Sequence, residues 1–152
     1  MANILIDKRL MVVKLNCKTK EEVLGALSEK LRALDLVTED FQKHLLEREE
    51  SFPTGLLASI PLALCHTEAQ YVKRSSMCAA SLMHPVEFHE MGNPEGLVNA
   101  EIVFLLALND PKEQVPWLKK MALIFKDETA LKTIKDAPSA EALATFMKSV
   151  LN

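Results

Sequence analysis

The nine-residue run from Ala100 to Leu108 (AEIVFLLAL) constrains the fold more than any other stretch of the chain. Only Glu101 interrupts its apolar side chains, so the run does not alternate between polar and apolar positions. A strand with one exposed face alternates with a period of two, whereas a strand covered on both faces is almost continuously apolar. We therefore expect a central strand at 100–108, with helices packed on both faces of its sheet.

Helix and strand signals alternate along the rest of the chain. Thr19 and Glu22 have the spacing of a capping box, and Asp110 followed by Pro111 is a further helix start. Pro116 lies further along and is expected to disturb the next turn. The expected helices cover about 19–34, 39–49, 110 onwards, 127–136 and 139–151, and the expected strands cover 10–17, 62–65, 76–83, 86–88 and 100–108. This order predicts an α/β fold with a mixed β-sheet sandwiched by helices on both faces.

Length and charge narrow the class of protein. At 152 residues the whole chain, 1–152, is expected to form a single domain. Its net charge of −3, from 18 Lys and Arg against 21 Asp and Glu, gives no support for binding to nucleic acid or an anionic membrane. The three cysteines form no CxxC pair, and no apolar run approaches the roughly 18–20 residues of a membrane span. Together with the lack of a signal-peptide pattern, these features predict a soluble cytoplasmic protein.

Cys65 and His66 end the apolar run at 62–65, and the histidine has three candidate roles. It is a strand-end histidine that donates to a backbone carbonyl, a metal ligand, or a nucleophile or general base. His84 and His89 stand five apart, which fits no common zinc spacing, so both are expected at the surface. Adjacent residues of a strand point to opposite faces, so Cys65 is expected to be a small buried hydrophobe rather than a partner of His66.

A nucleophilic His66 fits phosphoryl chemistry. Neutral imidazole is abundant near pH 7 and attacks phosphorus readily. A phosphorylated ring needs positive charge nearby, and the candidates are Arg48 at the end of the second helix and Lys112 near a helix N-terminus. Spacing alone does not show that these three side chains converge.

Four segments in order resemble a known family. LEREESFPTGL (46–56), LALCHTEA (62–69), HPVEFHEMG (84–92) and AEIVFLLALNDPKEQV (100–115) are similar to enzyme IIA of the bacterial phosphoenolpyruvate:sugar phosphotransferase system. The resemblance is to the fructose–mannitol superfamily, and within it to the galactitol-type branch, over essentially the whole chain. It implies a mixed sheet with helices on both faces. It also implies a phosphocarrier for the uptake of a hexitol such as galactitol.

The same resemblance implies the site and the partners. His66 stands at the position that accepts a phosphoryl group from phospho-HPr and passes it to a cysteine or histidine of enzyme IIB. Enzyme IIC, the membrane component, is then expected on a separate chain. Arg48 matches an arginine near the phosphoryl group, and Thr54 is expected to line the pocket. Thr67 or Glu68 is expected to orient the other ring nitrogen, with a backbone carbonyl as the alternative. No metal or organic cofactor is required.

Two positions depart from the family pattern. Cys65 replaces the usual proline before the histidine, which frees a φ angle and adds an N–H. Lys112 stands where mannitol-type members have a histidine, and it supplies charge without imidazole geometry. Transient docking predicts an apolar rim, with Leu56, Leu57 and Met91 as candidates and ordinary core as the alternative. Two further functions stay open: a regulatory relative that controls a transporter, kinase or transcription factor, and an interaction module with an inactive site.

Overall fold

The computed structural model describes residues 3–151, and its centre is a mixed five-stranded sheet. The strands are β1 (Met11–Leu15), β2 (Gly55–Leu56), β3 (Leu62–Cys65), β4 (Ser76–Glu90) and β5 (Asn93–Ala107). β1 runs parallel to β4, β4 antiparallel to β5, β5 parallel to β3, and β3 antiparallel to β2. β5 therefore has a neighbour on each side, and its apolar run is fully buried from Ile102 onwards, which confirms the predicted central strand.

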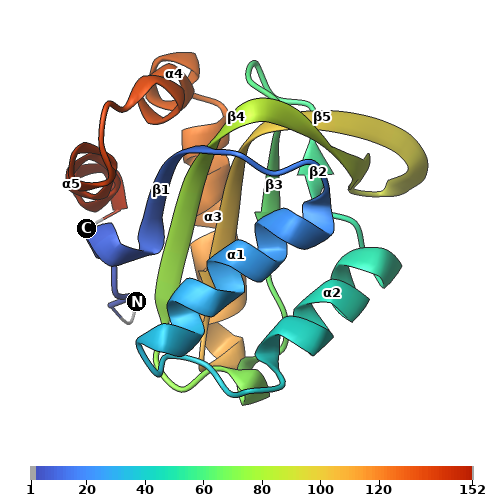
Figure 1. Cartoon of the computed structure of the whole chain (residues 1–152), viewed down its shortest axis with the longest axis vertical. Helices are drawn as coiled ribbons and strands as arrows, with labels where there is room; N and C mark the ends of the chain where they lie inside the picture. Colours follow the sequence, from blue (N-terminus) through green and yellow to red (C-terminus); the bar gives the residue numbers. More distant parts are fainter. Residues whose placement is uncertain (1–2, 152) are drawn as a thin grey trace.

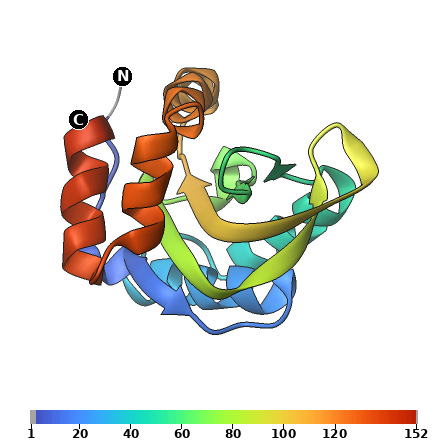
Figure 2. The same ribbon diagram turned by 90° about the horizontal axis from the view of Figure 1, so that it is seen from above.

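Helices cover both faces of this sheet, as predicted. They are α1 (Lys20–Ala33), α2 (Phe41–Ser51), α3 (Gln114–Phe125), α4 (Glu128–Asp136) and α5 (Ala140–Leu151). Figure 1 shows α1 and α2 in front of the sheet and α3 behind it, and Figure 2 shows α5 beside β1, with α4 next to α5. The rings of Phe104 in β5 and Phe125 in α3 lie 5.5 Å apart. Within residues 3–151, no helix has the length and apolar character that crossing a bilayer requires.

The helix starts follow the local sequence signals. The Thr19 hydroxyl accepts a hydrogen bond from the Glu22 N–H at 3.2 Å, and the Asp110 carboxylate accepts one from the Lys112 N–H at 3.0 Å. The expectation that Pro116 disturbs its helix is wrong. A short 3-10 turn, η3 (Pro111–Glu113), precedes α3, so Pro116 falls in the first turn of α3. Backbone N–H groups there have no partner within the helix, so the missing one costs nothing.

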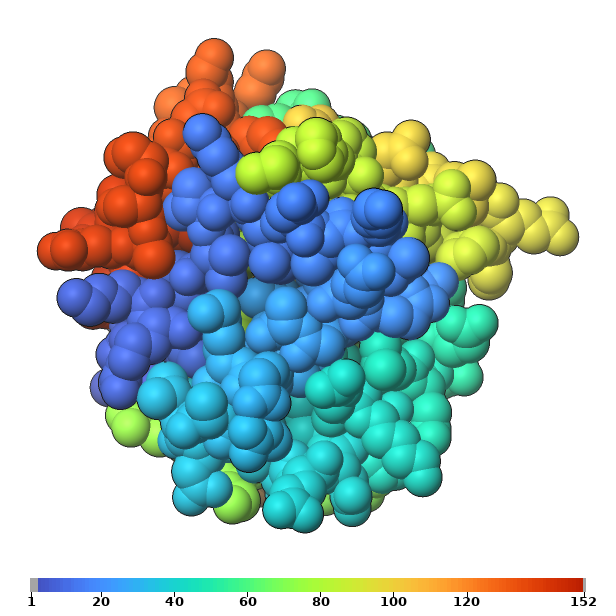
Figure 3. Space-filling view, in the orientation of Figure 1, coloured from blue at the N-terminus to red at the C-terminus, as the bar shows by residue number. Residues whose placement is uncertain are grey.

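The β4–β5 hairpin is longer than the apolar runs indicate. The runs at 76–83 and 86–88 belong to one strand, and β5 begins at Asn93 rather than at residue 100. Gly92, with a φ of 78°, makes the turn between them. The outer part of the hairpin lies beyond the helices and leaves Leu97 exposed, so it needs no continuous apolar sequence. Figure 3 shows the hairpin tip projecting past the face that α1 and α2 cover.

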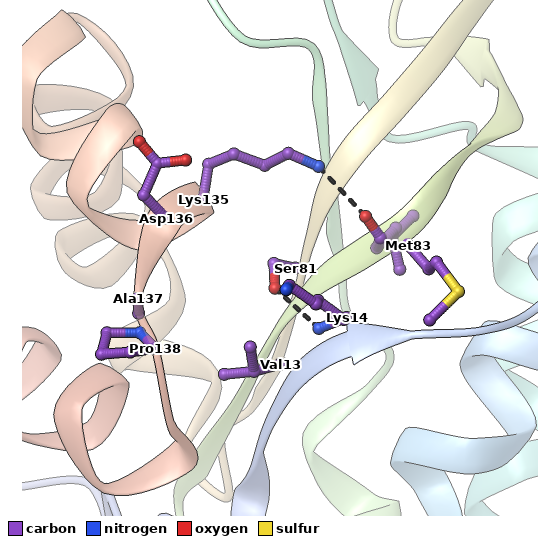
Figure 4. Close-up of a pocket in the computed structure, with 9 residues that line it drawn as sticks. Val13, Lys14, Ser81, Met83, Lys135, Asp136, Ala137 and Pro138 are labelled. Carbon is purple, nitrogen blue, oxygen red and sulfur yellow. Dashed lines mark hydrogen bonds between the residues drawn. The ribbon is translucent and has the colours of Figure 1, made fainter.

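A hollow of about 960 Å³ lies between β1, β4 and the α4–α5 link, next to an irregularity in β4. The register of β4 against β5 slips after Ser81, and the Leu82 carbonyl accepts a hydrogen bond from Lys135 Nζ at 3.0 Å (Figure 4). The same Nζ lies 3.7 Å from Glu101. On the other side, Ser81 Oγ accepts from the Lys14 N–H at 3.0 Å, across a bulge in β1. These contacts hold the irregular strand, and the hollow lies away from His66.

β2 ties the hairpin tip to the segment before His66. Gly55 pairs with Ala63 of β3, and its carbonyl accepts a hydrogen bond from the Met91 N–H at 2.9 Å. A Cβ at Gly55 would lie 2.6 Å from the His89 carbonyl oxygen, so only glycine fits where the tip crosses β2. β3 is therefore held between β5 on one side and β2 on the other.

Candidate functional site

His66 is the first residue after β3, and a backbone carbonyl holds its ring. Its Nδ1 lies 3.3 Å from the Leu64 carbonyl oxygen. A carbonyl oxygen only accepts hydrogen bonds, so Nδ1 carries the hydrogen in this contact and Nε2 keeps its lone pair. The geometry therefore leaves Nε2 as the ring nitrogen with a free lone pair. It also selects the backbone carbonyl, the alternative to Thr67 and Glu68, as the group that orients the other nitrogen.

The surroundings of His66 favour the neutral ring. Burial lowers its pKa below the usual 6.5, and the positive charge of Arg48 lowers the pKa further. The hydrogen bond to Leu64 and the negative charge of Glu68 act in the opposite direction, but the net change is downward. At pH 7 the imidazole is mostly uncharged, which is the form that attacks an electrophile.

Arg48 stands in the last turn of α2, beside the histidine. Its Nη1 lies 3.5 Å from Glu68 Oε1, and its guanidinium carbon lies 4.8 Å from the centre of the Phe52 ring. Arg48, Phe52 and Glu68 line a hollow of about 170 Å³ together with His44, Glu47 and Ser51. A guanidinium held this way can pair with the oxygens of an anion that reaches His66.

Thr67 and Glu68 contact each other rather than the ring. The Thr67 hydroxyl donates to Glu68 Oε2 at 2.6 Å, and this bond is the largest cause that lowers the pKa of the Glu68 carboxyl. Glu68 is thus ionised at neutral pH and faces Arg48. Of the two alternatives for the group that orients the imidazole, the structure has the backbone carbonyl of Leu64, 3.3 Å from Nδ1, rather than Thr67 or Glu68.

Thr54 lies behind the histidine rather than in an open pocket. It is only 3% exposed, and its hydroxyl donates to Glu49 Oε1 at 2.7 Å and lies 3.4 Å from Cys65 Sγ. Glu49, itself 4% exposed, was not expected at the site. One signal for it exists, since Phe41, Leu45 and Glu49 recur every four residues along the buried face of α2. A carboxylate on an apolar helix face needs partners inside the protein.

A comparison with known families decides what this arrangement belongs to. The profile of the family "Phosphoenolpyruvate-dependent sugar phosphotransferase system, EIIA 2" matches residues 4–150. The chain belongs to this EIIA family. Its role is that of a phosphoryl-transfer component of a sugar phosphotransferase system.

Individual relatives of this EIIA chain agree over most of its length. The galactitol-specific EIIA component of Escherichia coli K12 is 25% identical over 134 residues, which are 88% of this chain and 89% of the relative. Enzyme IIA for mannitol from Escherichia coli, solved in complex with phosphorylated enzyme IIB, superposes with a TM-score of 0.77 at 18% identity, covering 97% of this chain and 99% of that one. The nitrogen regulatory protein IIA-Ntr of Neisseria meningitidis gives 0.73 at 22%, covering 93% and 94%. These structures share the fold.

Lys112 is not brought to the histidine of this EIIA chain in the way that Arg48 is. It lies exposed in η3, which follows β5 at the sheet edge where β3 also ends. Among the described residues, the charges that shift the pKa of His66 are those of Arg48 and Glu68. His84 is exposed, and His89 is held by the Pro94 carbonyl at 2.8 Å from Nδ1. Residues 3–151 contain no group of three or more side chains placed to hold a metal ion.

The expected apolar rim lies at the wrong end of β3. Leu56 pairs with Leu62 and precedes the exposed Leu57, and Leu62 is four residues, or roughly 13 Å, from His66. Met91 joins this far group through its bond to Gly55. Phe52 is instead the exposed apolar side chain next to Arg48, with 61% of its surface accessible.

Proposed function

We propose that this EIIA chain carries a phosphoryl group on Nε2 of His66, taking it from phospho-HPr and passing it to an enzyme IIB in the cytoplasm. One observation carries the proposal: the Leu64 carbonyl holds Nδ1–H, which leaves Nε2 as the free lone pair beside Arg48. Membership of the EIIA family supports the donor and the acceptor.

The transfer needs only groups that the chain supplies. The lone pair of Nε2 forms a bond to phosphorus while the bond from phosphorus to the donor breaks, and the donor leaves with that electron pair. Nδ1 keeps its proton, and the Leu64 carbonyl stabilises the charge that the ring gains. Arg48 offsets negative charge on the phosphoryl oxygens. The reverse sequence delivers the group to enzyme IIB.

For the substrate we propose uptake of a hexitol such as galactitol. Support comes from the Escherichia coli galactitol-specific EIIA component, which aligns with 88% of this chain. Enzyme IIC, on another chain, would bind the sugar, so residues of this chain would not contact it. Purified enzyme IIB components of known specificity can be compared as acceptors, and preference for the galactitol type supports the assignment.

A regulatory role is the second candidate function. The likeness to the nitrogen regulatory protein IIA-Ntr shows that this fold also occurs in a protein with that name. Such a protein would control a transporter, kinase or transcription factor, and an inactive interaction module would need no phosphoryl group at all. Onward transfer to an enzyme IIB separates the carrier from both.

The first test is phosphorylation in a purified system. The protein is incubated with enzyme I, HPr and phosphoenolpyruvate, and its intact mass is measured before and after acid treatment. We expect an acid-labile gain of one HPO₃ group in the wild type, loss of that gain in His66→Ala, and retention of it in the control His84→Ala, whose histidine is exposed. No gain in the wild type, beside an active EIIA, would contradict the proposal and favour the interaction module.

A further inference from the structure

A buried carboxylate lies one layer behind His66, and the transfer itself does not use it. Glu49 accepts hydrogen bonds from the N–H of Thr54 at 2.8 Å and from its hydroxyl at 2.7 Å, and the sulfur of Cys65 lies 3.4 Å from the same hydroxyl. Burial raises the pKa of Glu49, while these donors and the charge of Lys20 hold it down. An ionisable group buried in this way costs folding free energy, and it persists where its hydrogen bonds fix a geometry.

These hydrogen bonds lead to the imidazole in short steps. The Thr54 carbonyl accepts from the Leu64 N–H at 3.2 Å, and the Leu64 carbonyl accepts from Nδ1 of His66. The Thr54 hydroxyl also lies 3.4 Å from the sulfur of Cys65, which is completely buried. Glu49 therefore fixes Thr54, and Thr54 fixes both the residue that orients the ring and the residue that precedes it.

We propose that Glu49, Thr54 and Cys65 form a positioning network that fixes the His66 imidazole with Nδ1–H on Leu64 and Nε2 free for the phosphoryl group. The proposal rests on the proposed phosphocarrier function. It also gives Cys65 a role: the contact of its thiol with the Thr54 hydroxyl holds the backbone of the residue before His66, which a proline at this position would hold by fixing φ. Because its thiol is buried and its pKa is raised, Cys65 is not itself a nucleophile.

The test removes the side-chain hydrogen bonds of Thr54 and Cys65 with little change in side-chain shape. Thr54→Val and Cys65→Ala are compared with Thr133→Val, which removes a hydroxyl bonded within α4, and Cys78→Ala, which removes another buried thiol. Two quantities are measured: the tautomer of His66 from two-bond nitrogen–hydrogen correlations, and kcat and KM for transfer from phospho-HPr. We expect mixed tautomers and a kcat lower by about tenfold, with KM nearly unchanged, only in the two network variants.

A rescue variant separates positioning from general stability. Cys65→Pro fixes φ at this position without a thiol. Its kcat should therefore be within about twofold of the wild-type value, even if its melting temperature is lower. Wild-type tautomer and kcat in well-folded Thr54→Val and Cys65→Ala would overturn the proposal. If either fails to fold, Cys65→Ser, which keeps a donor, must retain the Nδ1–H tautomer, and mixed tautomers there would equally overturn it.

The two proposals fail in distinguishable ways. An unphosphorylated wild type contradicts the phosphocarrier function, whereas the tautomer measurement needs no phosphoryl group and still decides whether the network holds the ring. Conversely, a phosphorylated wild type whose His66 tautomer ignores Thr54 and Cys65 leaves the carrier function in place and removes the positioning role.

Discussion

Two opposite charges act on the pKa of the His66 imidazole, in addition to its burial. Burial is the main cause that lowers the pKa of His66; the charge of Arg48 lowers it further and that of Glu68 raises it, and the two residues also pair with each other across 3.5 Å. Arg48 thus has an anionic partner before any phosphoryl group arrives. Its second neighbour, the Phe52 ring, limits the directions in which the guanidinium can turn.

Removing each charge is expected to move the titration of His66 in opposite directions. In Glu68→Gln the midpoint falls, because the ring loses a charge that stabilises its protonated form, and in Arg48→Gln it rises, because a repelling charge is gone. NMR titration of the ring measures both. Glu50→Gln, whose carboxylate is 77% exposed and 4.0 Å from Lys20, serves as the control and leaves the midpoint unchanged. Shifts of the same sign in the two test variants would contradict this account.

Sequence reasoning reached the residues that carry charge at the surface of the site, but not those behind it. His66 and Arg48 stand in recognisable segments. Leu64 and Glu49 lie in the same segments, but a backbone acceptor has no sequence signature, and only the spacing of Glu49 from Phe41 and Leu45 indicates that its side chain is buried. Thr54 is predicted to line the pocket because its turn belongs to a segment that resembles the family, but the sequence does not tell that its hydroxyl points to Glu49.

The apolar pattern of the sequence predicts the buried parts of the strands but not the outer part of the β4–β5 hairpin. β5 continues from residue 100 back to Asn93, and the pairing with β4 rather than apolar burial holds this outer part. Asn, Pro, Glu and Gly in 93–96 favour a loop locally, and the hairpin overrides that preference. β2, which is only two residues long, gives no periodicity at all, yet it fixes the segment before His66.

Two glycines in different elements should respond oppositely to an added methyl group. Gly55→Ala is expected to lower the free energy of unfolding by about 1–3 kcal/mol, because the methyl would meet backbone and the Val98 side chain with no room to move. Gly25→Ala, inside α1, meets only the flexible Gln42 side chain and should raise it by about 0.5–1 kcal/mol. Urea denaturation measures both free energies of unfolding. Equal changes in the two variants would contradict the close approach of the hairpin tip to Gly55 in β2.

At the scale of the molecule, the fold brings several chain segments to one edge of the sheet. β3 and β5 are parallel with Cys65 opposite Leu105, so His66 and the turn into α3 emerge together, and the end of α2 adds Arg48 and Phe52. The alternating helices and strands were enough to predict this layered arrangement. The position of Leu56 and Leu57 relative to His66 was not predictable, because it depends on the direction in which β2 pairs with β3.

Partner docking is expected to depend on the apolar group at this edge. Phe52→Ala should raise KM for phospho-HPr several-fold, because an exposed aromatic beside a reacting group is the usual anchor of a small transient interface. Leu123→Ala, equally exposed at 69% but on α3, is the control and should leave KM unchanged. Steady-state transfer assays measure both. An unchanged KM in Phe52→Ala would place the docking surface elsewhere, with the far group of Leu57 and Met91 as the next candidate.

The ion pair between Arg48 and Glu68 has a consequence for phosphoryl transfer in the proposed relay. In the proposed relay, Arg48 must give up part of its ion pair with Glu68 in order to pair with the phosphoryl group. Arg48 therefore stabilises the phosphorylated state less than an unpaired arginine would. If the proposed relay holds, the phosphorylated fraction of the protein would depend on the supply of phosphoenolpyruvate and on the uptake of the sugar.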